Sequence, residues 1–248
     1  MNITQLSALS RLFASNPAEA KALIKLASVD ILKSLGEGKY TIALGDKTLS
    51  AQSEKPLLEG MRYWTQLTQS KNQPPILSKL IAMPQLLHTF DKEQFHYTLK
   101  ELQNVLTQKT PASSIKQALF ENLANASTKE EFTQLSHLLL SMQHQVLSFP
   151  LLYSNTFALL QFKKRYNNKT KKQYLEFYAA LELLGPISGI ASLSDGDVAL
   201  SLNVAYEKTK QFLENDMKNF SYTLDISLSQ NIEPLYEPKL SSLLDLSI

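Results

Sequence analysis

The spacing of hydrophobic residues changes along the chain, and the first region combines a helical spacing with an alternating one. Asn16-Pro17 is typical of a helix start, and Gly36 is typical of a helix end. Between them, apolar residues recur every three to four positions, at Ile24, Ala27, Ile31 and Leu35. From Lys39 apolar and polar residues alternate over 40–44, 49–51 and 61–67, with Gly45-Asp46 as a turn. Residues 1–71 are therefore predicted to contain helix followed by a small β-unit.

The middle of the chain favours helices. It begins after Asn72-Gln73-Pro74-Pro75, which is typical of a linker. Thr128-Lys129-Glu130-Glu131 has the spacing of a helix capping box. Apolar stripes at helical spacing occupy 95–106, 115–123, 132–146, 153–160 and 174–184. Residues 72–184 are therefore predicted to form a helical bundle that ends before Gly185-Pro186.

The last region returns to alternation. Asp195-Gly196 is a favoured hairpin turn. The alternating apolar residues are Val198, Leu200, Leu202 and Val204, and then Leu224, Ile226 and Leu228. Between these strands, a helix is predicted from Phe212, Leu213, Met217 and Phe220. Residues 185–248 are predicted to form a ββαβ unit, which makes the fold class α+β.

Composition narrows the functional classes. The chain has 248 residues, of which 44% are hydrophobic, so it is long enough and apolar enough to form a buried core. The net charge of +2 argues against a protein whose main task is to bind nucleic acid. The absence of cysteine excludes disulfides, thiolate zinc sites and a cysteine nucleophile. Met1 to Ser10 do not resemble a signal peptide, and no stretch has the roughly 20 apolar residues of a membrane span. We therefore expect a cytoplasmic protein.

Motifs for chemistry or metal binding are weak. The histidines, His88, His96, His137 and His144, lack the i, i+4 spacing of a helical zinc site. Gly36-Glu37-Gly38-Lys39 is followed by a predicted strand, whereas a phosphate loop precedes a helix. Asp195-Gly196-Asp197 lacks the other ligands of a calcium loop. We expect no metal, no cofactor, no small-molecule substrate and no enzymatic activity, although a site assembled from distant residues stays possible.

Two surface features allow alternative interpretations. The conspicuous charge run consists of Lys163, Lys164, Arg165, Lys169, Lys171 and Lys172. A solvated helix–helix junction is favoured for it over a site for phosphate or an acidic partner. The aromatic residues of the N-terminal β-unit, Tyr40, Tyr63 and Trp64, are more typical of a core. Their alternative role is base stacking, which would make the β-unit a nucleic-acid-binding module.

Two segments resemble the flagellar hook-length control proteins. The first is Leu35 to Ala51, which reads Leu-Gly-Glu-Gly-Lys-Tyr-Thr-Ile-Ala-Leu-Gly-Asp-Lys-Thr-Leu-Ser-Ala, followed by Pro56-Leu57 and Gly60. The second comprises Leu184-Gly185-Pro186-Ile187, the strand 198–204, the helix 208–220 and Leu224-Asp225-Ile226, and it is similar to that family's C-terminal specificity-switch domain.

The resemblance implies a cytoplasmic regulator of flagellar or type III export, with its own export through the flagellar apparatus as an alternative. Its implied partner is the cytoplasmic domain of the export-gate switch protein. The implied contact residues are Leu184, Gly185, Leu202 and Leu224.

Overall fold

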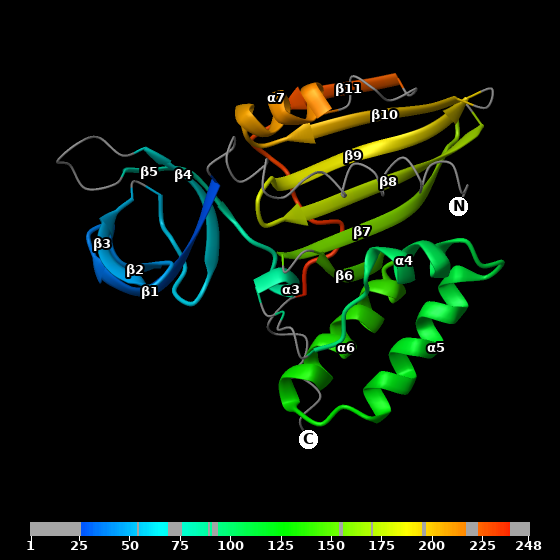
Figure 1. Ribbon diagram of the computed structural model, residues 1–248, viewed down its shortest axis with the longest axis horizontal. Helices are drawn as coiled ribbons and strands as arrows, with labels where there is room; N and C mark the ends of the chain where they lie inside the picture. Colours follow the sequence, from blue (N-terminus) through cyan, green and yellow to red (C-terminus); the bar gives the residue numbers. More distant parts are fainter. Residues whose placement is uncertain are drawn as a thin grey trace.

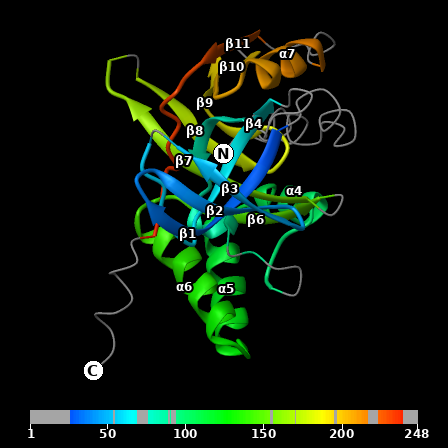
Figure 2. The ribbon, with the colours of Figure 1, turned by 90° about the vertical axis from the view of Figure 1, so that its left-hand side faces the viewer.

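The computed structural model describes residues 26–53, 55–68, 76–88, 90, 94–153, 156–169, 171–194, 197–216 and 223–238. These residues form a five-stranded sheet and a six-stranded sheet, with helices beside the larger sheet (Figure 1). The smaller sheet lies at one end of the molecule, and a view onto that end shows its strands in front of the larger sheet (Figure 2).

The smaller sheet is antiparallel throughout. It contains β1 (Leu26–Gly36), β2 (Lys39–Leu44), β3 (Lys47–Gln52), β4 (Arg62–Thr68) and β5 (Ile76–Ala82), in the order β3-β2-β1-β4-β5. The turn between β1 and β2 needs glycine at Gly38, which has a φ of +72°. A Cβ at this position would lie 2.7 Å from the Ser53 carbonyl oxygen. The sheet has its own core of buried residues, Val29, Ile31, Tyr40, Ile42 and Tyr63.

The helix predicted across 24–35 is wrong for the described residues, because 26–36 form strand β1. The apolar residues there fit a period of two as well as a helical period, since Val29 and Ile31 are buried and Asp30 between them is less so. β1 pairs with β2 on one side and with β4 on the other. Two flanking strands supply backbone hydrogen bonds that the local pattern does not reveal. The proposed helix start at Asn16-Pro17 lies outside the described residues.

The larger sheet is mixed. Its strands are β6 (Leu147–Tyr153), β7 (Thr156–Asn167), β8 (Lys172–Leu181), β9 (Gly185–Ser194), β10 (Asp197–Val204) and β11 (Thr223–Leu228). They follow chain order across the sheet, and every pair is antiparallel except β10 and β11. The parallel pair is joined by a crossover that contains helix α7 (Glu207–Asp216), as a parallel connection requires.

The predicted helical bundle over 72–184 is therefore wrong. Helices occupy only part of that range, as α3 (Gln85–His88), α4 (Leu99–Leu106), α5 (Pro111–Ala124) and α6 (Lys129–Gln143). Residues 76–82 and most of 147–181 are strands. The centres of β7 and β8 are buried on both faces, so 158–162 and 177–181 are continuous buried runs. Such runs lack the alternation that identifies a strand, and they are easily mistaken for helix. The proposed linker 72–75 lies outside the described residues.

The boundary expected between 184 and 185 falls inside this continuous sheet. β8 pairs with β9 from Tyr174↔Ser192 to Leu181↔Gly185. The strand, strand, helix and strand expected after residue 185 are present as β9, β10, α7 and β11. However, they extend the sheet that β6, β7 and β8 begin, and they do not form a separate unit. The turn residues Asp195-Gly196 lie outside the described residues, between paired Ser194 and Asp197.

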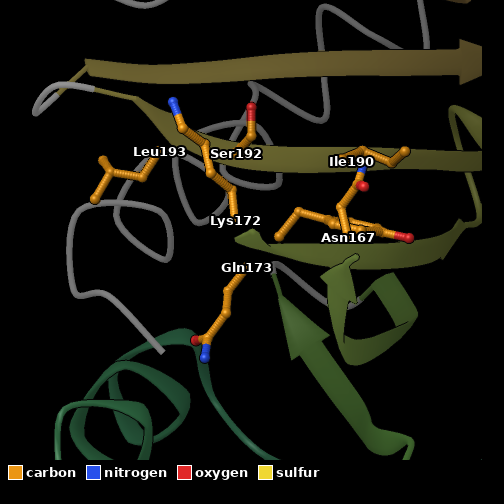
Figure 3. A pocket seen from close by; sticks show the side chains of 7 residues that line it. Asn167, Lys172, Gln173, Ile190, Ser192 and Leu193 are labelled. Carbon is orange, nitrogen blue, oxygen red and sulfur yellow. The ribbon is translucent and has the colours of Figure 1, made fainter. Parts of the chain in front are cut away.

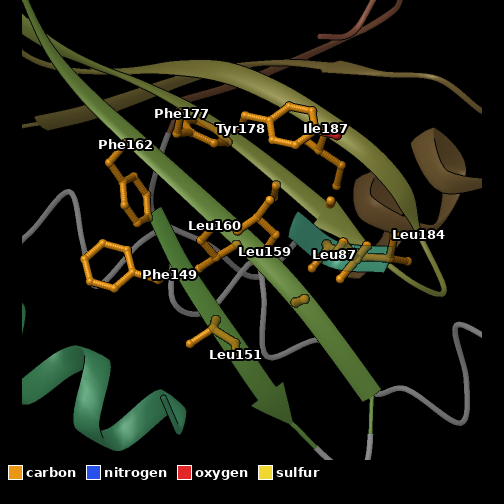
Figure 4. Packing of buried hydrophobic residues seen from close by; sticks show 14 of the residues in the cluster. Leu87, Phe149, Leu151, Leu159, Leu160, Phe162, Phe177, Tyr178, Leu184 and Ile187 are labelled. Atoms are coloured by element: carbon orange, nitrogen blue, oxygen red, sulfur yellow. The ribbon is translucent and has the colours of Figure 1, made fainter. Parts of the chain in front are cut away.

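The main core joins the sheet to the helices. Figure 4 shows Phe149 of β6, Phe162 of β7 and Phe177 of β8 with the aliphatic residues around them. Tyr97, just before α4, places its ring edge-on to Phe149 at 5.5 Å between centroids. Tyr97 also hydrogen-bonds to β6, because its amide donates to the Pro150 carbonyl and its carbonyl accepts from Leu152. The outer edge of β6 is thereby covered.

The helices begin at the residues that satisfy their first backbone amides. Thr98 and Glu101 form a capping box at α4. At α6, the predicted cap is present in part: the Thr128 hydroxyl accepts from the Glu131 amide at 3.1 Å. The Glu131 carboxylate accepts from the amide of Ser127, one residue earlier than the motif predicts.

Trp64 connects the two sheets. It lies on β4 of the smaller sheet, yet its fully buried side chain belongs to the main core. A second link is made by Tyr206, whose hydroxyl donates to the Lys79 carbonyl of β5 at 3.0 Å. The smaller sheet is thus fastened to the larger one by packing and by a hydrogen bond.

Candidate protein-interaction surface

The residues implied by the resemblance as contacts are mainly core residues. Leu184 and Leu202 are 4% and 0% exposed, Gly185 is buried, and Leu224 is half-buried. Gly185 has a φ of +80°, and a Cβ there would lie 2.7 Å from the Tyr206 ring. Because most of these residues are buried, direct contacts with a partner protein have to come from exposed residues beside them.

Leu184 and Gly185 lie where several elements meet. The Leu184 carbonyl accepts a 2.8 Å hydrogen bond from the buried Thr209 hydroxyl in the first part of α7. The Tyr206 ring lies against Gly185, and its burial raises the pKa of the Tyr206 hydroxyl. This junction fixes α7 relative to the β8–β9 turn and to β5.

Strand β11 provides an exposed edge. Within the described part of the chain it pairs on one side only, with β10. Of the alternating residues predicted to be buried, only Ile226 is buried, whereas Leu224 is half-buried and Leu228 is 49% exposed. Asp225 is exposed as well. An edge strand with outward backbone groups and an exposed leucine can accept a segment of another protein.

Helix α7 supplies the neighbouring side of this surface. Phe212 and Leu213 are buried in the main core. The exposed residues of the helix are Glu207, Lys208, Gln211, Glu214 and Asn215. Lys210 and Glu214 form an i, i+4 ion pair at 3.8 Å, which has little effect on stability at such an exposed position. The exposed residues of α7 and β11 together are called the switch surface.

The basic run lies on a β-hairpin, so the expected helix–helix junction is wrong. Lys163, Lys164 and Arg165 end β7, Lys169 and Lys171 lie in the connection, and Lys172 begins β8. Arg165 pairs with Glu176 at 2.8 Å. The hairpin between β7 and β8 that carries the run lies at one end of the larger sheet (Figure 1).

A shallow hollow of about 500 Å³ adjoins this basic hairpin (Figure 3). Its lining comes from β7, β8 and β9 and consists of Asn167, Lys172, Gln173, Tyr174, Ile190, Ser192 and Leu193. Ile190 is 43% exposed. Sequence analysis did not identify the hollow, because its residues come together only through the β8–β9 pairing.

The segment after β11 covers another part of the same sheet. The Gln161 side chain donates to the Tyr236 carbonyl at 2.7 Å and accepts from the Tyr236 amide at 3.1 Å. The Glu237 carboxylate accepts from the Gln85 amide of α3 at 2.7 Å. Desolvation raises the pKa of Glu237, and this hydrogen bond opposes the rise. No motif in the sequence indicates these contacts. Gln161 lies in β7, where the buried run has no alternation that would identify a strand.

The histidines lie in separate environments. His137 on α6 is 6% exposed, burial lowers its pKa, and its Nε2 has no hydrogen-bond partner among the residues that the structure describes. His144 is the C-cap of α6, and its ring lies 5.4 Å from that of Tyr236. His88 Nε2 lies 3.8 Å from Asp30 Oδ1, and His96 bonds locally to the Gln94 carbonyl. Among the described residues, no group of three or more His, Asp or Glu side chains is placed to hold a metal ion.

The aromatic residues considered for base stacking are buried. Tyr40, Tyr63 and Trp64 are 6%, 7% and 0% exposed. The two tyrosine hydroxyls accept hydrogen bonds from the Leu57 and Leu58 amides, which fixes the loop before β4. These side chains offer no stacking surface in this conformation.

Comparisons with known proteins identify no relative. No protein-family model matches the chain, and neither a curated protein nor a solved structure does. In the described residues, no helix is long and apolar enough to cross a membrane.

Proposed function

We propose that this protein regulates flagellar or type III protein export in the manner of the hook-length control proteins. It acts by binding the cytoplasmic domain of the export-gate switch protein, and this chain performs no chemistry. Since the comparisons give no relative, the proposal rests on the two resembling segments and on the structures they adopt.

The main observation in its favour is the arrangement of the second segment. Residues 198–204 form β10, residues 207–216 form α7, and residues 223–228 form β11 parallel to β10. The resemblance names a strand at 198–204, a helix at 208–220 and then Leu224-Asp225-Ile226, in this order. Leu184-Gly185 lies beneath them, at the junction with α7. Leu184 and Gly185 therefore contact the first part of the helix that carries one side of the switch surface and the residue just before it.

The first resembling segment also folds as one piece. The glycine turns join β1, β2 and β3, and the Pro56-Leu57 step returns the chain to β4. Gly60 has a φ of +75°, and its amide donates to the Ile31 carbonyl at 2.8 Å. Each feature quoted for the resemblance thus has a structural role in the smaller sheet.

Leu228 offers a direct test of binding through the switch surface. The full chain and the purified cytoplasmic domain of the export-gate switch protein from the same organism are mixed, and their affinity is measured by titration calorimetry. Leu228→Glu places a charge on an exposed edge strand that has to lose water on binding. We expect this variant to lower the affinity by about tenfold or more, as for a central interface residue.

Phe132 is the matched control, because it is 51% exposed on α6, which is a different part of the molecule. Phe132→Glu is expected to leave the affinity unchanged. No binding by the unmodified chain contradicts the proposal, and an equal loss in both variants contradicts the assignment to the switch surface. Circular dichroism of both variants establishes that they remain folded.

A further inference from the structure

The larger sheet has a hollow with a cluster of cations at one end, on the β7–β8 hairpin. Strand alternation places Arg165, Tyr174 and Ile190 on the same face. On that face, β7 and β8 bring Asn167 and Lys172 opposite each other at the hairpin end of the hollow. Figure 3 shows Ile190 and Ser192 on β9, with the Asn167 side chain extending toward Ile190 and the Lys172 side chain toward Ser192.

This part of the face differs from the rest of it. Farther along, Gln161 and Tyr178 are 0% and 1% exposed, and the Gln161 side chain binds the backbone of the segment after β11. Ile190 is 43% exposed although it lies on a central strand of the sheet. Ile190 and the half-buried Tyr174 and Leu193 together leave an apolar area open to solvent in the hollow.

The charge of the rim indicates the chemistry of the partner. Residues 163–172 contain lysines and an arginine but no aspartate or glutamate. Glu176 pairs with Arg165, and Asp197 begins the adjacent hairpin strand, so two acidic residues lie nearby. The cations outnumber them, and Lys169 and Lys171 are exposed in the hairpin connection. The surface potential is therefore positive and attracts an acidic segment.

We propose that this basic hairpin and its hollow bind an acidic protein segment that carries an apolar side chain. The carboxylates pair with the lysines of the hairpin, and the apolar side chain contacts Ile190 and the Tyr174 ring. This inference does not depend on the export function. It concerns a different face from the switch surface, so either proposal can fail alone.

A protein segment suits this surface better than nucleic acid. The hollow has one aromatic ring, that of Tyr174, whereas single-stranded nucleic acid binds to several aromatic platforms along a basic track. Tyr166 is exposed, but it does not line the hollow. The cations are concentrated at one hairpin and do not follow the sheet as a track.

The test uses the full chain and a short fluorescent peptide of aspartate and glutamate with one central leucine. Binding is measured by fluorescence anisotropy at low and high salt. We expect Lys169→Glu with Lys171→Glu to weaken binding about tenfold at low salt, and high salt to weaken binding by the unmodified chain. The matched control is Lys100→Glu with Lys109→Glu, which makes the same change in net charge on and after α4. It is expected to change affinity less than about twofold.

Two further measurements separate the contributions. Ile190→Ser is expected to lower the affinity for the leucine peptide. The lowered affinity should equal that of the unmodified chain for a peptide in which serine replaces the central leucine. A thymidine oligonucleotide of equal charge is expected to bind more weakly than the leucine peptide. Tighter oligonucleotide binding, equal losses in both lysine variants, or no effect of Ile190→Ser would each overturn the proposal. Circular dichroism confirms that each variant is folded.

Discussion

Truncation of Leu202 to alanine tests whether the C-terminal strands are part of one sheet. Leu202 is fully buried on β10 and lies opposite Gly189 of β9 and Ile226 of β11. The Phe177 ring lies against Gly189, where an added Cβ would be 2.8 Å from it. Removal of the Leu202 side chain therefore leaves a void lined by the Gly189 backbone, the Phe177 ring and the Ile226 side chain.

The expected cost is in the upper part of the range for buried leucines, which is about 2–5 kcal/mol. Collapse into the void is restricted, because β10 is hydrogen-bonded on both sides and Gly189 has no side chain to reorient. With a urea dependence of about 2–3 kcal/mol per molar, the unfolding midpoint is expected to fall by about 1.2–2.5 M. The neighbouring Ser201→Ala is the control, because Ser201 is exposed on the other face.

Two probes report on different parts of the molecule. Circular dichroism at far-ultraviolet wavelengths follows all secondary structure. Fluorescence follows the chain's single tryptophan, Trp64, which is buried where the smaller sheet meets the main core. In Leu202→Ala, both transitions are expected to move by the same amount, since the strands share one sheet and one core.

A different result would refute this reasoning. If circular dichroism loses part of its amplitude while the Trp64 transition stays in place, β9 to β11 unfold as an independent unit. A shift no larger than that of Ser201→Ala would show that Leu202 is not part of the core.

Three further predictions concern the junction and the segment after β11. Gly185→Ala is expected to cost about 1–3 kcal/mol in thermal unfolding, because it adds a Cβ against the Tyr206 ring at a positive φ; an unchanged melting temperature would contradict this. The folded-state pKa of Glu237 is raised from 4.5, so its stabilising contribution is present below that value and is lost as pH rises through the folded-state pKa. The free energy of unfolding of Glu237→Gln is therefore expected to rise relative to that of the unmodified chain as pH increases. Parallel dependences of the two free energies on pH would contradict this. Gln161→Leu removes both hydrogen bonds to Tyr236, so hydrogen exchange of that amide is expected to accelerate, and unchanged protection would show that other contacts hold the segment.

The sequence predicted those elements whose residues face core on one side and solvent on the other. Val198, Leu200, Leu202 and Val204 alternate with more exposed residues and form β10. Helix α6 begins after Thr128, as its capping motif indicates. In these places the local pattern and the final environment agree.

Elements buried on both faces could not be predicted in the same way. β7 contains the buried run Leu159, Leu160, Gln161 and Phe162, where neither a period of two nor a helical period is distinct. The pairing of β8 with β9 joins residues that the sequence assigned to different domains. Local patterns do not encode which strand becomes a neighbour.

The sequence indicated some of the residues near the candidate surfaces but not how the fold arranges them. The resemblance indicated Leu184, Gly185, Leu202 and Leu224, which lie beneath the switch surface or only partly within it. The resemblance consists mainly of small and apolar residues. Residues of these types are usually buried, so it indicated residues of the interior. The basic run was visible as a charge pattern, but its position beside Ile190 depends on the sheet.

The regulatory role is tested most directly in cells of the source organism. The gene is deleted, and hook length is measured on isolated hook–basal bodies by electron microscopy. The account predicts hooks of uncontrolled length, restored to normal by the unmodified gene and by Phe132→Glu but not by Leu228→Glu. Hooks of normal length in the deletion strain would contradict the proposed function.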